Sequence, residues 1–259
     1  MAMRTKVIVS LVITALLFTV VACTAAKEKT EAKISPAEAA IQAAAKQNLY
    51  IFAIFFKQND EASTKMLEEA KKLQAQHSSR ANFISIDITD TANKELMTRY
   101  GVDRAPIPLT LVIAPNGAVT AGYPNKINKT DLSEAFVSNG MAAVLKILQG
   151  GKLAVICVQN SNTKLNKESL AVAEGLGNDA MFRNAIEIVK IDPSDASEAK
   201  LIQSCRVDTK SQNAQLVIIA PPGRIVGTFD GTATTETIIA ALTKAFSGGG
   251  GCAPGGCGG

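Results

Sequence analysis

Five cysteines are the side chains of this sequence that most readily do chemistry. A thiolate can be acylated, can form a disulfide, and binds soft metal ions such as Cu(I) or Hg(II). No two of them form a Cys-x-x-Cys pair and there is one histidine, so the common zinc patterns are poorly supported. The five are Cys23, Cys157, Cys205, Cys252 and Cys257.

Cys23 follows a segment with the layout of an export signal. Arg4 and Lys6 precede an almost wholly apolar run at residues 7–21, which is short for a transmembrane helix and typical of a signal peptide. The run ends in VVAC, which resembles the bacterial lipobox. The resemblance implies that the Cys23 thiol receives a diacylglyceryl group and that the chain is cut before it. An uncleaved anchor helix with an incidental cysteine is the alternative.

The lipobox resemblance implies a lipid-anchored protein of the cell envelope, with the membrane as a partner. Residues 1–22 would be the lipoprotein signal peptide, and acyl chains such as palmitate on Cys23 would hold the mature protein. Thr24 replaces the aspartate that retains lipoproteins at the inner membrane. This favours the outer membrane, facing the periplasm, if the cell has two membranes. Residues 23–36 are small, polar and charged, which predicts a lipidated tether.

The rest of the chain repeats one order of elements, and the aspartates that end equivalent strands, Asp87 and Asp192, lie 105 residues apart. Hydrophobic periodicity and turn residues set the boundaries, with Gly150-Gly151 between the copies. Strands are expected at residues 49–56, 83–88, 109–114 and 118–123, then 153–158, 186–191, 216–220 and 224–229. Helices are expected at residues 61–76, 93–100 and about 131–148, then 167–176, 197–205 and 234–246.

This order, with KMLEEAKKL, SIDITD and RYGVDRAPIPLTLVIAPNGAV, resembles thioredoxin-like proteins. The resemblance covers residues 37–148 and, more weakly, 152–247. It implies an α/β fold of two tandem thioredoxin-like domains, at residues 37–150 and 151–247. Each would have a mixed central sheet flanked by helices.

The thioredoxin resemblance also shows which chemistry is missing. The family attacks disulfides with a Cys-x-x-Cys that faces a cis-proline. Residues 57–60 (KQND) and 159–162 (QNSN) occupy that place without any sulfur. Pro108 is the cis-proline candidate of the first copy, and Ala214 stands there in the second. Disulfide reduction by the thioredoxin mechanism is therefore not expected.

The remaining polar residues of the two copies receive structural interpretations. Cys157, in an apolar strand, is expected to be a buried small hydrophobe, and a disulfide to Cys205 remains possible in an oxidising compartment. Asp87 and Asp192 are taken to end central strands and, without a nearby thiol, to cap turns rather than relay protons. His77 lies at a polar helix end and is expected to be solvated.

Residues 248–259 form a glycine-rich tail that holds Cys252 and Cys257. Such a segment buries too little surface to offset its ordering entropy, which predicts a flexible tail. It could be inert. The cysteine pair could instead be a mobile dithiol, a site for a soft metal ion, or a source of disulfides to another chain.

Together these features predict a membrane-tethered, redox-inactive thioredoxin-like binding or scaffold lipoprotein of the bacterial cell envelope. The alternative is an envelope thiol carrier or soft-metal, copper-like chaperone that acts through Cys252 and Cys257. Enzymatic activity is disfavoured, no cofactor is required beyond a possible soft metal ion, and an envelope protein is the expected partner. The net charge of +4 without a dense basic run argues against nucleic acid.

Overall fold

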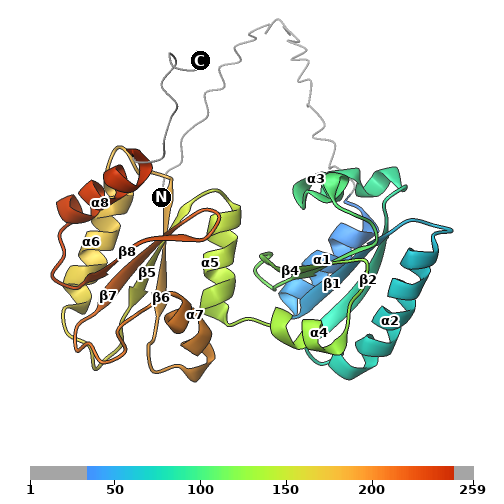
Figure 1. The fold of residues 1–259 in the computed structure, drawn as a ribbon, viewed down its shortest axis with the longest axis horizontal. Helices are drawn as coiled ribbons and strands as arrows, with labels where there is room; N and C mark the ends of the chain where they lie inside the picture. The colour runs from blue at the N-terminus through green and yellow to red at the C-terminus, as the bar shows by residue number, and fades with distance from the viewer. Residues whose placement is uncertain (1–33, 248–259) are drawn as a thin grey trace, which may run out of the picture. The chain divides into compact units, whose positions relative to one another are not determined.

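The computed structural model describes residues 34–247 of the 259-residue chain. They form two α/β repeats, each built on a four-stranded mixed sheet with helices on both faces (Figure 1). Among these residues, no helix is both long and apolar enough to cross a membrane. The signal peptide, Cys23 and the tail predicted from the sequence lie outside the described residues.

The first sheet has the strand order β2-β1-β3-β4. Its strands are β1 (Tyr50–Phe56), β2 (Ala81–Asp87), β3 (Leu109–Ile113) and β4 (Val119–Pro124). β1 pairs parallel with β2 and antiparallel with β3, and β3 and β4 form a hairpin. Its helices are α1 (Pro36–Lys46), α2 (Glu61–His77), α3 (Lys94–Arg99) and α4 (Lys129–Ala135). α1 and α3 supply the core on one face of the sheet, and α2 and α4 supply it on the other.

The second sheet repeats this topology with the order β6-β5-β7-β8. Its strands are β5 (Leu153–Val158), β6 (Ile186–Ile191), β7 (Gln215–Ala220) and β8 (Arg224–Asp230). Its helices are α5 (Asn139–Gln149), α6 (Asn166–Asn178), α7 (Ala199–Ser204) and α8 (Thr235–Ser247). α5 and α7 cover one face, and α6 and α8 cover the other. The described chain is thus a pair of tandem thioredoxin-like domains, as the sequence predicts.

The single helix expected at about residues 131–148 is two helices, α4 and α5. Phe136 leaves the helix to pack against Tyr50 and Phe52. Ser138 then caps α5 by accepting a hydrogen bond from the Met141 amide. The hydrophobic side of α5 contributes to the core of the second sheet, so each repeat opens with a helix.

The strands that carry Asp87 and Asp192 are edge strands rather than central ones. Each repeat begins with a helix, so no further strand pairs with the outer side of β2 or β6 in the described chain. The two aspartates therefore end strands at the border of their sheets.

Candidate functional site

The loop at residues 57–60 joins β1 to α2 and is closed by its own hydrogen bonds. The Asp60 carboxylate caps α2 by accepting from the Ser63 amide at 2.7 Å. The Ser63 hydroxyl accepts from the Lys57 backbone amide at 3.2 Å, and the Gln58 side-chain Nε2 donates to the Asp87 carboxylate. The loop thus presents amide and carboxylate groups at the place where a thioredoxin carries its nucleophile.

Asp87 is engaged in a turn. Its carboxylate accepts from the Thr89 hydroxyl at 2.7 Å and from the Thr89 amide at 2.8 Å. The same two bonds join Asp192 to Ser194 in the second repeat. These bonds, the side-chain one first, lower the pKa of both carboxyl groups. Both aspartates therefore cap turns as predicted and remain ionised, which does not suit a proton relay.

The corresponding loop of the second repeat, residues 159–165, is longer and more heavily hydrogen-bonded. The Asn160 side chain donates to Asp192 at 2.9 Å and accepts from the Asn162 amide at 2.9 Å. Further along, Lys164 pairs with the segment that precedes β7. This loop also holds no sulfur.

The Ile107–Pro108 peptide bond is cis, as the sequence predicts for this position. Pro108 is buried, and its carbonyl accepts from the Asn125 amide at 2.8 Å. Ala214 stands at the equivalent position. A second cis bond, Pro221–Pro222, lies in the turn before β8 and was not predicted. Its signal in the sequence is the Pro-Pro pair itself, since only X–Pro bonds adopt cis readily.

Cys157 and Cys205 are free thiols, so the disulfide that the sequence left possible is not formed. The side chain of Cys157 packs with the core under α6 and α8. Cys205 packs with the core on the opposite face, under α5 and α7. The sheet separates the two sulfurs. Burial raises the pKa of each thiol to about 11, so both are protonated and unreactive near neutral pH.

His77 is half-buried, which corrects the expectation that it is solvated. Its ring lies 5.9 Å from the Phe136 ring, and its Nε2 atom is buried without a hydrogen-bond partner. The Arg80 guanidinium covers the same Phe136 ring at 4.0 Å. The cause is Phe136, which folds back onto this end of α2 after leaving α4.

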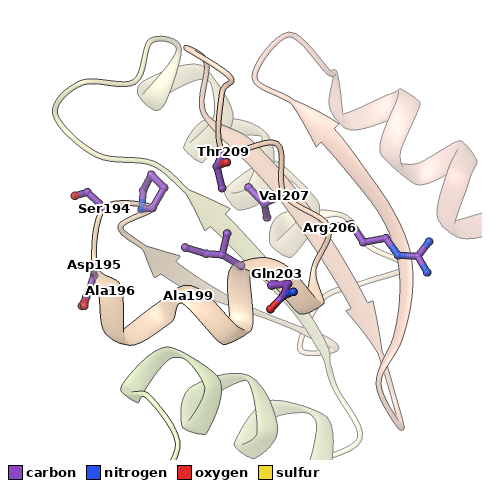
Figure 2. Close-up of a pocket in the computed structure, with 10 residues that line it drawn as sticks. Ser194, Asp195, Ala196, Ala199, Gln203, Arg206, Val207 and Thr209 are labelled. Carbon is purple, nitrogen blue, oxygen red and sulfur yellow. The ribbon is translucent and has the colours of Figure 1, made fainter.

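A cavity of about 400 Å³ lies beside α7 (Figure 2). Small, apolar and polar residues line it, among them Ser194, Asp195, Ala199, Val207 and Thr209. The Arg206 side chain extends away from Val207 and Thr209 in Figure 2. Asp195 is the carboxyl group of the lining, and its side chain accepts from the Ser197 amide at 2.8 Å, so it caps the short helix at residues 196–198.

The remaining candidate residues, Cys23, Cys252 and Cys257, lie outside the described residues. Within residues 34–247, no three His, Cys, Asp or Glu side chains gather as metal ligands would.

No protein-family model and no curated protein matches the sequence. Solved structures match it over both repeats. The F subunit of alkylhydroperoxide reductase from Enterococcus faecalis is 13% identical, over 81% of this chain and 100% of that chain, with a TM-score of 0.28. Zinc-bound human ERp44 is 12% identical, over 79% and 57%, with a TM-score of 0.32. The first two thioredoxin domains of Saccharomyces cerevisiae Eps1p are 10% identical, over 76% and 92%, with a TM-score of 0.27. At such identities, the matches say nothing of activity.

Proposed function

We propose that this protein is a membrane-tethered, redox-inactive thioredoxin-like lipoprotein of the bacterial cell envelope that serves as a binding or scaffold module. One observation carries the proposal: both loops at the Cys-x-x-Cys position lack sulfur, and the polar side chains of each loop form hydrogen bonds within its own repeat. Asp60 caps α2, and Asn160 joins its own loop to Asp192. Thiol–disulfide exchange requires a thiolate, and the described residues offer none there.

The location follows from the N-terminal sequence. The lipobox-like VVAC motif supports lipid on Cys23, and Thr24 supports the periplasmic face of an outer membrane in a cell that has one. The membrane is then one partner and an envelope protein the other. Neither role needs a cofactor.

A reductase assay tests the redox part of the proposal. Residues 24–259, and the Cys252→Ser/Cys257→Ser variant of the same segment, are given insulin and dithiothreitol, with thioredoxin as the positive control. The variant should precipitate insulin no faster than dithiothreitol alone. Faster precipitation by this variant would mean that the folded repeats reduce disulfides, and the proposal would fail.

A second candidate function is an envelope thiol carrier or soft-metal chaperone. Burial keeps Cys157 and Cys205 protonated, which leaves Cys252 and Cys257 as the reactive candidates of a lipid-modified chain. Competition against a Cu(I) chelator tests metal binding, and equilibration in glutathione buffers between roughly −120 and −230 mV tests the dithiol. Stoichiometric Cu(I) binding or reversible oxidation, lost in the double serine variant, would favour this function. If the double variant behaves as the wild type in both, this function is excluded.

A further inference from the structure

The helices that open the two repeats, α1 and α5, begin in the same way. Each has 11 residues and a serine cap. The Ser35 hydroxyl accepts from the Glu38 amide at 3.2 Å, and the Ser138 hydroxyl accepts from the amide three residues on at 3.1 Å. The first turn of a helix leaves backbone amides without partners inside the helix. The two repeats can therefore be compared for the groups that these amides bind.

In the second repeat, the donors at the start of α5 bind a carboxyl group of the same repeat. Glu198 accepts from the Gly140 amide at 2.8 Å and from the Ser138 hydroxyl at 2.6 Å. The Glu198 side chain is buried, so these two bonds replace the water that it gives up. The start of a helix thus serves in this chain as a seat for a carboxylate, in keeping with the direction of the helix dipole.

The first repeat has the same two donors but no acidic side chain to meet them. Asn93 ends the short helix before α3, as Glu198 ends the one before α7, and its Nδ2 donates to the Asp87 carbonyl at 3.1 Å. In the part of the chain that the structure describes, neither the Ala37 amide nor the Ser35 hydroxyl proton has an acceptor. Ser35 is 7% exposed. Two donors that hold a carboxylate in the second repeat are therefore left open in the first.

A cavity of about 460 Å³ lies beside these donors. Ala37 and Asn93 line it, and Ala40, Phe83 and Ile84 add apolar walls. The Asn93 side-chain amide carries two hydrogens, and one of them is used on the neighbouring carbonyl. A carboxylate alone would not fill this volume. The cavity therefore has room for an apolar stem of several carbons attached to the carboxylate.

Two aspartates also line the cavity, and their charges disfavour an anion. They are Asp87 and Asp90, and both are engaged in turns. Asp192 and Asp195 stand in the same turns of the second repeat. Glu198 is nevertheless buried at the start of α5 in that repeat. A carboxylate at the start of the helix is thus compatible with these aspartates.

The Ala37 methyl group determines how closely a carboxylate can approach α1. A Cβ on Gly140, which stands at the equivalent position, would lie 2.6 Å from Glu198 Oε2. A carboxylate at α1 therefore has to lie further from its helix than the Glu198 carboxylate lies from α5. A separate molecule can take this offset, because it is not tied to a backbone position.

We propose that the cavity beside α1 binds a carboxylate on a short apolar stem, which accepts hydrogen bonds from the Ala37 amide and the Ser35 hydroxyl. Two sources share this chemistry: a small aliphatic carboxylic acid, and the side chain of a glutamate in a partner protein. The inference rests on the proposed binding function and names the group that the first repeat recognises.

Amide NMR of residues 24–259 during titration with sodium butyrate tests the site. The Ala37 amide proton should move downfield and saturate with a Kd of about 1–10 mM. The Gly140 amide, which Glu198 already occupies, should not move. Sodium chloride at the same concentration is the control for ionic strength. No saturable shift at Ala37 with butyrate or with the peptide described next, or an equal shift with chloride, would overturn the proposal.

A capped peptide with a central glutamate between alanines, and the same peptide with glutamine, distinguish the two sources. A shift at Ala37 with butyrate alone assigns the site to a small carboxylic acid. A shift with the glutamate peptide that the glutamine peptide does not produce assigns it to a partner protein. Equal shifts with both peptides would show that no carboxylate is recognised, and the proposal would be wrong.

Ser35→Asp and Ser35→Asn form a matched pair of variants. Both side chains cap helices well, so α1 should be retained. The asparagine amide can donate to a carboxylate, whereas the aspartate cannot donate and repels it. We expect Ser35→Asp to weaken binding about tenfold or more and Ser35→Asn to weaken it much less. Equal affinities of the two variants would refute the site. That failure is distinct from failure of the proposed function, which is read from insulin reduction.

Discussion

At the scale of single residues, burial decides which thiols can react. The pKa values of Cys157 and Cys205 rise from 9.0 to about 11 because desolvation penalises the thiolate. We expect iodoacetamide to alkylate either thiol at least about 100-fold more slowly than an ordinary thiol at the same pH. Mass spectrometry after quenching measures this, with the same protein in urea as the control. Rapid alkylation in the native state would contradict the burial.

The same pKa shifts link stability to alkaline pH. Folded Cys157 and Cys205 keep their protons up to a pKa of about 11, whereas the unfolded thiols ionise near 9.0. The unfolded state therefore binds fewer protons in this window, and the thiols' contribution is full below about pH 9 and lost as pH rises toward 11. Urea unfolding across this range should show a smaller loss of stability in Cys157→Ala/Cys205→Ala than in the wild type. Equal losses would assign the effect to other groups.

The two turn aspartates allow an internally controlled titration. Hydrogen bonds from Thr89 lower the pKa of Asp87, and bonds from Ser194 lower that of Asp192. Thr89→Val should raise the pKa of Asp87 toward its usual value and leave Asp192 unchanged, as read by carboxyl NMR. Because the folded pKa is depressed, the bonds stabilise the fold above the unfolded pKa, and this is lost as pH falls. An unmoved Asp87 pKa would exclude Thr89 as its cause.

How well the sequence predicts a residue's role depends on how local its environment is. Pro108 and Asp87 could be assigned because short motifs define their loops. The environment of His77 could not, because it is set by Phe136, which is distant in sequence and packs there only after the fold has formed. The separation of Cys157 from Cys205 likewise depends on the face of the sheet that each contacts.

At the scale of elements, the start of α5 is fixed by a buried carboxylate. Glu198 is 5% exposed and accepts from the Ser138 hydroxyl at 2.6 Å and from the Gly140 amide at 2.8 Å. A Cβ on Gly140 would lie 2.2 Å from Ile191 Cδ1 and 2.6 Å from Glu198 Oε2. The first turn of α5 therefore has no room for a side chain at residue 140.

Gly140→Ala should accordingly reduce the free energy of unfolding by about 1–3 kcal/mol, the usual cost of overpacking. Gly177→Ala is the matched control, because Gly177 is also helical and an added Cβ there meets no atom within 4 Å. That control should be neutral or slightly stabilising. Urea denaturation measures both, and equal stabilities would mean that the turn shifts freely.

Element boundaries were predictable where periodicity alone decides them, as in β1, β5 and α2. The break between α4 and α5 was not, because apolar spacing continues through it while Phe136 and Ser138 each find a tertiary or capping role. The loop at residues 159–165, between β5 and α6, shows the same limit. Its length can be read from the sequence, but its bridge to residues 212–214 depends on where β7 begins in space.

At the scale of the whole molecule, two described repeats follow an N-terminal segment for which the sequence predicts a lipid anchor on Cys23. Pro36 and Ala37, at the start of α1, line one cavity with Phe56 and Asp87. Phe56 precedes the sulfur-free loop at residues 57–60, and Asp87 accepts a hydrogen bond from the Gln58 side chain of that loop. The proposed scaffold function depends on the lipid anchor that the sequence predicts on Cys23, so the anchor itself has to be tested.

Detergent cloud-point phase separation provides that test for the chain expressed with residues 1–22. The wild type should enter the detergent phase, because each buried methylene of an acyl chain contributes about 0.8 kcal/mol. Cys23→Ser removes the acylated thiol, so its product should not carry lipid, whereas Cys252→Ser/Cys257→Ser should partition as the wild type. Mass spectrometry of the N-terminus completes the experiment. If Cys23→Ser partitions like the wild type and the wild-type chain itself retains residues 1–22 without lipid, the anchor is an uncleaved helix and the lipoprotein assignment is wrong. If the wild type instead begins at an acylated Cys23, the tether holds the repeats at the membrane by lipid alone, and its length sets how far they reach toward a partner.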